Sequence, residues 1–364
     1  MGKTFGVGIM GCGHISEIYM ANIPAFRSLH LVACADIRPE AAQAKAAAHG
    51  IAALTPEALL ADDGIDIVLN LTTPAHHKAI ACAALSAGKH VYGEKPLALD
   101  VAEAREILEL AARADLAVGS APDTFLGGAH QTARAAIDAG RIGRPLSGMA
   151  VMMVPGHERW HHNPEFYYQP GGGPLYDMGP YYLTALVNML GPVARVVGIG
   201  GKGFASRTIG TGPKAGTSFP VEIDSHVAAV LEFAQGAIVS MVMSFDVKAH
   251  TGGHIEIYGT DGSLSVSDPN RFEGPIRLAG VDREWRELDQ THAYGDGNHR
   301  GLGLADMATA LSEGRQPRAS GALAFHVLEI MEAVSTACRT GAAVDLHACP
   351  ERPQPMAPAT LEQE

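Results

Sequence analysis

The sequence lacks the features that mark several classes of protein. Its 27 lysine and arginine residues are outnumbered by 39 acidic residues, which gives a formal net charge of −12. The basic surface with which nucleic-acid-binding proteins contact phosphates is therefore missing. No uninterrupted apolar run approaches the roughly 20 residues that cross a bilayer, and the sequence does not open with the pattern of an export signal. We therefore expect neither a nucleic-acid nor a membrane partner.

Cysteine is scarce, and its spacing excludes the common cysteine motifs. The five cysteines are far apart and form no CxxC pair, which disfavours a disulfide framework or a zinc site. His161 and His162 are adjacent rather than one helical turn apart, so they lack the spacing of helical metal ligands. We therefore predict reduced thiols, a cytoplasmic protein and no metal site.

What the sequence contains is a 47% share of hydrophobic residues over 364 positions, enough for a substantial core. This length suggests two domains or one large α/β unit. Up to about residue 121, short apolar strands alternate with helical patterns, which predicts a parallel, doubly wound α/β sheet. The expected strands cover residues 5–10, 29–36, 65–71, 90–92 and 116–121, and the expected helices cover 14–26, 40–49, 77–87 and 101–114.

The pattern changes after about Pro122. After one further expected helix at 131–139, residues 227–247 and 254–266 alternate between apolar and polar side chains, as antiparallel hairpins do. Helical patterns return between about 299 and 339, and a proline-rich tail follows. We predict domains over residues 1–122 and 123–346 and a loosely ordered tail over 347–364. The helices within 299–346 are expected to be able to pack back on the first domain.

A glycine-rich turn follows the first predicted strand. Gly11 permits a tight turn, and Gly13 lets the backbone approach a pyrophosphate. The helix start at His14 and Ile15 offers unpaired N–H groups to the phosphates. Ser16 stands where this dinucleotide-binding motif usually has Gly or Ala, and it is small enough for close helix–strand packing. A purely structural glycine turn is the alternative.

Asp36 ends the second predicted strand, about where an acidic residue accepts hydrogen bonds from the adenosine ribose hydroxyls. A carboxylate there repels a 2′-phosphate and favours NAD over NADP, although Arg38 can offset that repulsion. The alternative is a turn-initiating residue before Arg38-Pro39. NAD is therefore the expected cofactor, and NADP stays open.

Three further stretches carry a resemblance to a known family. The first runs from Thr73-Pro74-Ala75-His76-His77 through residues 87–91 to Glu94-Lys95-Pro96. The second covers residues 171–181 and the third residues 258–264. With these stretches the chain resembles the Gfo/Idh/MocA oxidoreductases, named for glucose–fructose oxidoreductase and inositol dehydrogenase, over residues 5–346.

The resemblance implies an N-terminal Rossmann dinucleotide-binding domain and a C-terminal domain built on an open, mostly antiparallel β-sheet, with a site in the cleft between them. It implies that Lys95 lies by the substrate and the nicotinamide. The family motif Asp-x-Gly-x-His maps to Asp177, Gly179 and Tyr181, where tyrosine replaces the commoner histidine. The other residues expected beside the cofactor are Thr72, Thr73, Pro74, His77 and Glu94. For His77 a capped helix start is equally open.

Oxidation of a secondary alcohol requires removal of the hydroxyl proton as hydride leaves the carbon. A free tyrosine, with a pKa near 10, is a poor base at neutral pH, but a lysine ammonium within roughly 4–6 Å would lower that pKa. We hypothesise that Tyr181 is the acid/base, Lys95 its electrostatic partner and Asp177 the orienting residue. Lys95 as the direct proton donor is the rival. The structural alternatives are a solvated loop lysine, an Asp177 that N-caps a helix expected from about Pro180 to Met189, and a packed Tyr181.

Residues 157–164 form a dense polar and aromatic stretch. Trp160 can stack against a sugar face. Arg159, His161 and Asn163 can hydrogen-bond hydroxyls, so we predict substrate contacts here. An oligomer contact or a surface loop is the alternative.

The sequence thus predicts an NAD(P)-dependent dehydrogenase or reductase that acts on a sugar, sugar derivative or cyclitol. Two alternatives stay open: an NAD-dependent glycosidase that recycles its cofactor, as some members of the family do, and a non-catalytic NAD- or sugar-sensing protein. The apolar alternation of the later strands, together with the resemblance, predicts a homodimer or homotetramer.

Overall fold

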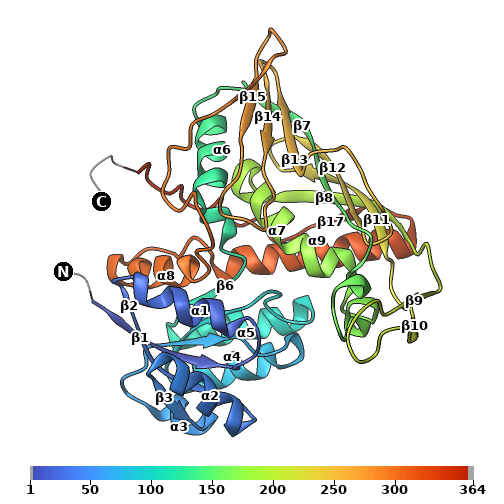
Figure 1. Ribbon diagram of the computed structural model, residues 1–364. Coiled ribbons are helices and arrows are strands. Elements are labelled where there is room, and N and C mark those ends of the chain that lie inside the picture. The colour runs from blue at the N-terminus through green and yellow to red at the C-terminus, as the bar shows by residue number, and fades with distance from the viewer. Residues whose placement is uncertain (1–2, 360–364) are drawn as a thin grey trace. The chain divides into compact units, whose positions relative to one another are not determined.

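The computed structural model describes residues 3–359, which divide into two compact units (Figure 1). Among these residues, the first unit comprises 3–126 and 298–328, and the second comprises 127–297 and 329–359. The chain thus enters the second unit after Leu126 rather than after residue 122. The helices expected from residue 299 onward are shared between the two units.

The first unit is built on a six-stranded parallel sheet with the order β3-β2-β1-β4-β5-β6. The central strands β1 and β4 are buried at every position, as expected of a parallel sheet that helices cover on both faces. The predicted Rossmann-like sheet is confirmed. Its strands are β1 (Phe5–Met10), β2 (Leu29–Ala35), β3 (Ala52–Leu54), β4 (Ile67–Asn70), β5 (His90–Gly93) and β6 (Val118–Ser120).

Two helices of the first unit begin at a side-chain N-cap. Asp100 accepts the Glu103 backbone N–H at 2.8 Å and starts α5, while Thr55 accepts from Ala58 and starts α3. The segment β3–α3 was not predicted, because both elements are short. The helices are α1 (Ser16–Asn22), η1 (Ile23–Ala25), α2 (Pro39–His49), α3 (Pro56–Ala61), η2 (Pro74–His76), α4 (His77–Ser86), α5 (Val101–Ala114), η3 (Thr124–Leu126) and α8 (Leu302–Glu313).

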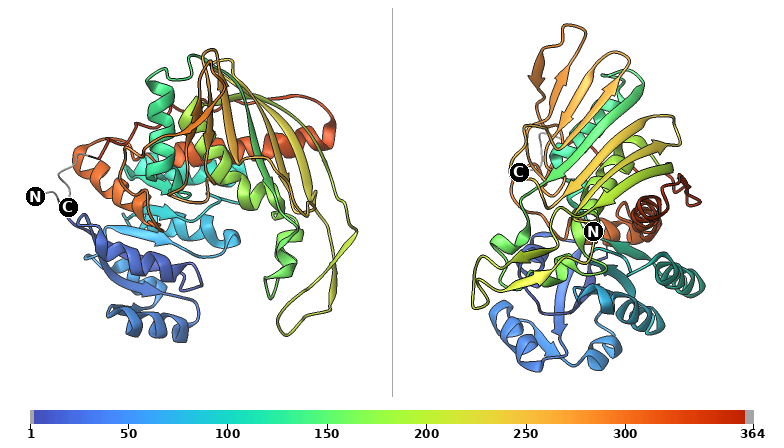
Figure 2. Two further views of the ribbon diagram at one scale, coloured as in Figure 1. Left: turned by 45° about the horizontal axis from the view of Figure 1, so that its top comes forward. Right: turned by 90° about the vertical axis from the view of Figure 1, so that its right-hand side faces the viewer.

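The second unit is built on a nine-stranded sheet with the order β16-β15-β14-β13-β7-β12-β11-β8-β17, in which only β7 and β12 pair in parallel. Both predicted hairpins are present, as β11–β12 and β13–β14 (Figure 2). The strands are β7 (Pro145–Met153), β8 (Val193–Gly201), β11 (His226–Phe233), β12 (Ile238–Ser244), β13 (Ile255–Gly259), β14 (Ser263–Val266), β15 (Arg277–Ala279), β16 (Trp285–Glu287) and β17 (Val344–Asp345), and β9 (Ser206–Thr208) pairs separately with β10 (Ser218–Pro220).

Helices α6 (Gly128–Asp138) and α7 (Gly173–Leu190) pack on this sheet, α7 against β7, β11 and β12. The sequence predicted the α7 region to be helical only from about Pro180, because a proline is typical of a helix start. The helix instead begins at Gly173, seven residues before Pro180, and Gly172 is its N-cap. Pro180 therefore lies inside the helix. Asp177 is therefore within the helix, and the alternative that it is an N-cap is wrong.

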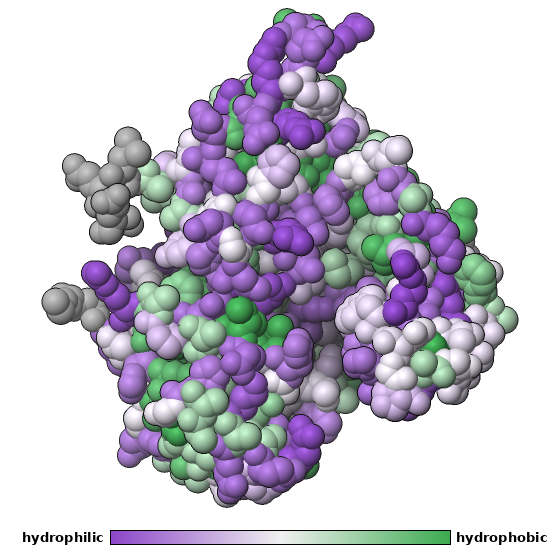
Figure 3. Space-filling view, viewed as in Figure 1, coloured by the Kyte–Doolittle hydropathy of each residue, from purple (hydrophilic) through white to green (hydrophobic). Residues whose placement is uncertain are grey.

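Large apolar side chains are exposed along four neighbouring strands of this sheet: Met149, Val197, Ile199, Val230 and Ile238. Val230 pairs directly with Val197 and Ser240, and Ser240 with Met149, so these side chains lie on one face. We call these five residues the apolar sheet face. In the view of Figure 3, by contrast, hydrophilic residues cover most of the visible surface.

The helix α9 (Gly321–Thr340) is long and apolar enough to qualify as a candidate membrane span by length and composition. However, 56% of its most apolar 18-residue window is buried inside the protein. It also carries Glu329 and Glu332. A mostly buried apolar helix is typical of a protein core.

The tail was expected to be loosely ordered. Up to residue 359 it has little regular secondary structure, yet hydrogen bonds fix it to the second unit. Arg352 donates to the Asn188 carbonyl at 2.7 Å, and the Met356 N–H donates to Gln131 at 2.9 Å. The remaining residues, 360–364, lie outside the described part of the chain.

Candidate functional site

The sequence-predicted cofactor residues come together at one edge of the first unit's sheet. Their loops follow β1, β2, β4 and β5, which are neighbours in the sheet and end in register, with Met10 paired to Ala35 and Asn70. The strand order reverses between β1 and β4, the point at which doubly wound sheets bind dinucleotides. The residues at this edge are Gly11, Gly13, His14, Ile15, Asp36, Arg38, Thr72, Thr73, Pro74, His77, Glu94 and Lys95.

The glycine-rich turn after β1 has the geometry that a pyrophosphate requires. Gly11 has φ +100°, and a Cβ there would lie 2.7 Å from the Leu71 carbonyl carbon, so only glycine fits. A Cβ at Gly13 would meet no atom within 4 Å, which leaves open space over the turn for a ligand. Ser16 is buried, and its hydroxyl donates to the Gly13 carbonyl at 2.7 Å. Serine therefore serves at the third motif position, and the turn fits a dinucleotide.

Asp36 lies just after β2 and binds the glycine-rich turn directly. Its Oδ2 accepts the Cys12 N–H at 2.8 Å, and its Oδ1 accepts the Arg38 N–H at 2.9 Å. The bond to the Arg38 N–H closes the turn that the alternative interpretation of Asp36, as a turn-initiating residue, predicted. Each carboxylate oxygen has a further lone pair, so Asp36 can still accept ribose hydroxyls. The Arg38 side chain lies 3.7 Å from Oδ1 and is 65% exposed.

His77 is buried at the start of α4, with both ring nitrogens near backbone carbonyls. Nδ1 lies 2.6 Å from the Pro96 oxygen, and Nε2 lies 3.0 Å from the Thr72 oxygen. The ring thus joins the loop after β4 to the loop that carries Lys95. The cofactor contact predicted for His77 stays a prediction, and the two ring contacts also give this residue a positioning role between the loops. Thr73 and Pro74 in the same loop are exposed.

The Glu-Lys-Pro run follows β5. Glu94 accepts the hydroxyl of the buried Tyr19 at 2.7 Å and the Lys95 backbone N–H at 3.1 Å. Burial, followed by the nearby Glu94 charge, raises the pKa of Tyr19, so this phenol stays a hydrogen-bond donor. The Glu94 side chain is therefore engaged within the protein, and the backbone at half-buried Lys95 is fixed.

In the second unit, α7 carries Asp177 and Tyr181 one turn apart on one helix face. Asp177 Oδ2 lies 2.9 Å from Nε2 of His157, a residue of η4 (His157–Arg159). The side chains of His157 and Asp177 are 13% and 19% exposed. No role was predicted for His157, because nothing in the sequence relates it to an aspartate 20 positions away.

Aromatic rings surround His157. Its ring centre lies 4.4 Å from that of Phe245, 4.5 Å from Tyr167 and 5.3 Å from Trp160. Trp160 is 59% exposed, which leaves its ring available to stack on a sugar. Among these rings, only Trp160 was predicted from the sequence. Tyr167, in η5 (Glu165–Tyr168), and Phe245, after β12, lie outside the stretch 157–164.

The other predicted substrate residues lie in the same segment, between β7 and α7. Arg159 and Asn163 are exposed, and His161 is half-buried and accepts the Asn163 N–H at 3.1 Å. Burial is the main reason that the pKa of His161 falls below its ordinary value. These positions agree with a ligand-facing segment and equally with the surface-loop alternative.

A buried ion network holds η4 in place. Glu158 is bound by the Tyr168 hydroxyl and by Arg207, which donates to it at 3.0 Å and also pairs with Asp246. Arg207 donates further to the Phe245 carbonyl at 3.0 Å. Because Glu158 adjoins His157 in sequence, this network fixes the backbone that carries His157.

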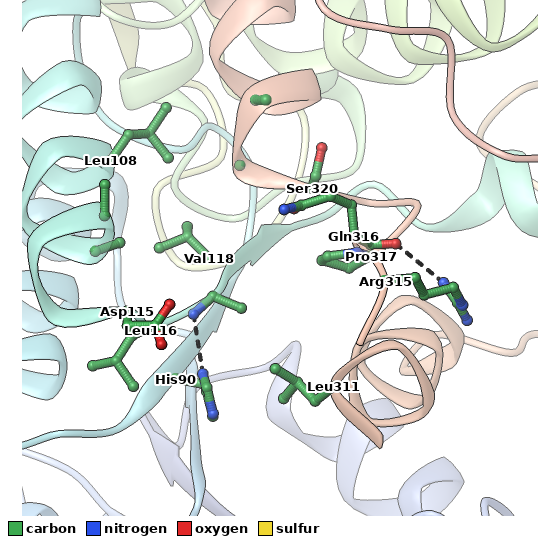
Figure 4. A pocket seen from close by; sticks show the side chains of 15 residues that line it. His90, Leu108, Asp115, Leu116, Val118, Leu311, Arg315, Gln316, Pro317 and Ser320 are labelled. Atoms are coloured by element: carbon green, nitrogen blue, oxygen red, sulfur yellow. Dashed lines mark hydrogen bonds between the residues drawn. The ribbon is translucent and has the colours of Figure 1, made fainter. Parts of the chain in front are cut away.

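A cavity of about 440 Å³ in the first unit lies away from the cofactor edge. It opens where β5 and β6 begin, beside His90, Val118 and Arg315 (Figure 4). Ligands of doubly wound sheets bind at the carboxyl ends of the strands, so this cavity is not the cofactor site. Among residues 3–359 no cluster of His, Cys, Asp and Glu could hold a metal ion.

Comparison with known proteins assigns both units. Residues 5–121 match the model of an oxidoreductase family with an NAD-binding Rossmann fold, and residues 130–265 match the GFO/IDH/MocA C-terminal domain. The chain is 28% identical to 1,5-anhydro-D-fructose reductase of Ensifer adhaerens, over 93% of this chain and 98% of that protein. It is 26% identical to levoglucosan dehydrogenase of Pseudarthrobacter phenanthrenivorans, over 81% and 83%.

Solved structures share the fold. A levoglucosan dehydrogenase in complex with NADH and L-sorbose superposes with a TM-score of 0.81 at 23% identity, over 96% of this chain and all of that one. An aldose-aldose oxidoreductase from Caulobacter crescentus gives a TM-score of 0.76 at 21% identity, over 94% and 100%.

Proposed function

The chain belongs to the Gfo/Idh/MocA family of oxidoreductases, and from this we propose that it transfers a hydride between NAD and a secondary alcohol or ketone of a ring-shaped polyol. The substrate class would be a sugar, an anhydrosugar or a cyclitol. Support comes from the relatives' names, which include 1,5-anhydro-D-fructose reductase, myo-inositol 2-dehydrogenase and levoglucosan dehydrogenase.

One observation carries the cofactor part of the proposal: there is open space at Gly13, in the turn whose Cys12 N–H binds the Asp36 carboxylate. When bound, a nicotinamide cofactor accepts or donates the hydride. The glycine-rich turn would hold its pyrophosphate, and Asp36 would accept the ribose hydroxyls. A carboxylate at this position favours NAD over NADP.

For the substrate, we propose that Lys95, Asp177 and Tyr181 bind the reacting hydroxyl. A lysine ammonium and a carboxylate can donate to and accept from one hydroxyl, which holds it in a single orientation. The exposed Trp160 ring would bind the apolar face of the sugar, with Arg159, His161 and Asn163 available to its other hydroxyls.

The test is absorbance at 340 nm with NAD or NADP and a panel of monosaccharides, sugar acids, anhydrosugars and inositols. We expect sustained NADH formation with one class of substrate. With the same substrates, NADPH formation from NADP should be slower. Tight NAD binding without net reduction on any substrate would contradict the dehydrogenase proposal. It would favour the cofactor-recycling glycosidase, or the sensor if glycosides were also left intact.

We also propose that the chain forms a homodimer or homotetramer through the apolar sheet face. Exposed Val, Ile and Met side chains on neighbouring strands are unusual on a monomer, because contiguous apolar surface is normally covered. The alternation of buried and exposed residues along β11 supports this, since Ala228, Val230 and Glu232 on its outward side are exposed.

A further inference from the structure

We infer that His157 is the proton-transfer residue of this enzyme and that Asp177 fixes its tautomer. The inference rests on the proposed dehydrogenase function and names a catalytic group for it. It starts from the Asp-x-Gly-x-His motif, in which this chain has Tyr181 instead of histidine. The structure supplies an imidazole on the aspartate of that same motif, from the segment between β7 and α7.

The hydrogen bond between His157 and Asp177 determines where the imidazole proton lies. An ionised carboxylate only accepts hydrogen bonds, so Nε2 must donate its N–H across the 2.9 Å contact to Asp177 Oδ2. Neutral His157 then has a lone pair at Nδ1. Within the described residues, Nδ1 has no hydrogen-bond partner. A base held in one tautomer by a carboxylate is a recurrent arrangement in proton-transfer catalysis.

The surroundings keep this imidazole in one orientation. Phe245 and Tyr167 pack on the ring at 4.4 and 4.5 Å between centres. The adjoining Glu158 is fixed by the buried Arg207. Such rigid support is what a general base needs to meet a substrate hydroxyl reproducibly.

The proposed step balances as follows. In the oxidising direction the substrate O–H proton goes to His157 Nδ1, the C–H bond releases a hydride to the oxidised nicotinamide, and a C=O bond forms. In the reducing direction His157 returns the proton to the new alkoxide oxygen. An imidazole ordinarily titrates near neutral pH, whereas a phenol requires a lowered pKa to act as a base there. Tyr181 as acid/base stays a prediction that the same experiment tests.

The decisive variant is His157→Gln, whose side-chain amide can still donate to Asp177 but cannot take up a proton. We expect kcat/KM to fall by about 10²–10⁴-fold, the usual contribution of general acid–base catalysis. The loss of activity at low pH that a protonated base causes should disappear. NAD affinity and thermal stability should be unchanged. His49→Gln is the matched control, because His49 also lies beside a carboxylate, with Nε2 3.2 Å from Glu17.

A second readout does not depend on turnover. In the ¹⁵N spectrum of the histidine rings, the signals that disappear in His157→Gln belong to His157. In the wild-type protein these signals should show a protonated Nε2 and an unprotonated Nδ1. Asp177→Asn should shift that tautomer balance. A protonated Nδ1 in the wild-type protein would overturn the inference.

The inference is also overturned if His157→Gln keeps wild-type activity and its acidic limb. If Tyr181→Phe alone removes that limb, Tyr181 is the acid/base. Failure of the proposed function would look different, since the wild-type protein would then reduce NAD with no substrate of the panel.

Discussion

At the scale of single residues, hydrogen bonds from a few side chains to backbone groups hold the loops of the candidate cofactor site. The Asp36 carboxylate holds the N–H of Cys12 in the glycine-rich turn, so the residue that would select the ribose also shapes the turn that would hold the phosphates. His77 similarly connects the Thr72 and Pro96 carbonyls of two loops at the same sheet edge.

Asp36→Ser should change the choice of cofactor. Removing the carboxylate removes both an acceptor for the ribose hydroxyls and a charge that repels a 2′-phosphate, while Arg38 stays. We expect NAD affinity to fall by roughly tenfold or more, the value of a charge-assisted hydrogen bond of about 1.5–3 kcal/mol. NADP affinity should rise, as measured by fluorescence titration.

Asp66→Asn provides the matched control for that titration. Asp66 accepts the Gly6 N–H at 2.8 Å, as Asp36 accepts that of Cys12, but it lies at the amino edge of the same sheet. An unaltered NAD to NADP ratio in Asp36→Ser would contradict the assignment of Asp36.

At the scale of elements, buried charged side chains connect segments that are distant in sequence. In the first unit, Asp123 lies before η3 and its Oδ2 accepts the N–H groups of Gly301 and Gly303 at the start of α8, at 2.8 and 3.1 Å. In the second unit, Arg207 of β9 joins η4 to the segment after β12.

Asp123 should make stability depend on pH in a direction unusual for a carboxyl group. Burial raises its pKa to about 6, against the opposing effect of the two N–H groups. The folded state therefore binds the proton more tightly than the unfolded chain. Its stabilising contribution is complete below about pH 4 and is lost as pH rises through about 6.

Asp123→Asn keeps an oxygen that accepts both N–H groups and removes this titration. As the pH rises from 4 to 7, we expect the free energy of unfolding of the variant to increase by roughly 2–3 kcal/mol relative to that of the wild-type protein. Urea unfolding of both proteins across this range measures the difference, in which the other titrating groups cancel. A difference that does not vary with pH would contradict the raised pKa.

Arg207→Met should destabilise the second unit and the segment that carries His157. The Arg207 side chain is 6% exposed, and its loss leaves the 8% exposed Glu158 without its counter-charge. Breaking one partner of a buried ion pair costs about 3–5 kcal/mol, so thermal unfolding should move to lower temperature.

Arg195→Met is the control for Arg207→Met. Arg195 pairs with Asp345 at 2.6 Å, but both side chains are more than half exposed, so solvent screens the pair. Similar melting temperatures for the two variants would argue against the buried network.

At the scale of the whole molecule, the apolar sheet face exposes five large apolar side chains on neighbouring strands, and we propose that it forms the subunit interface. Val230→Arg or Ile199→Arg places a charge within this face and should convert the oligomer to a monomer, because burying an unpaired charge in an interface is unfavourable. Light scattering after size-exclusion chromatography gives the mass of each variant.

Val281→Arg is the matched control, since Val281 is an apolar side chain that is 91% exposed but lies outside the apolar sheet face. The wild-type protein and this control should share one oligomeric mass. A monomeric wild-type protein, or an oligomer that survives Val230→Arg, would contradict the proposed interface.

The sequence by itself determined the parallel sheet, the strand-end positions of Gly11, Asp36 and Lys95, and the family. Local periodicity and turn chemistry express the sheet and the strand ends within short windows, and the family was identified by the resemblance of motifs such as Glu94-Lys95-Pro96. Helix α7 was predicted too short, because Pro180 is typical of a helix start although it lies within this helix.

Only the tertiary structure decided which side chains meet. The pairing of His157 with Asp177, the Phe245 and Tyr167 rings against it and the Arg207 network join segments that are distant in sequence. The nine-stranded sheet and its connections bring these segments together, and no periodicity of the chain encodes that pairing.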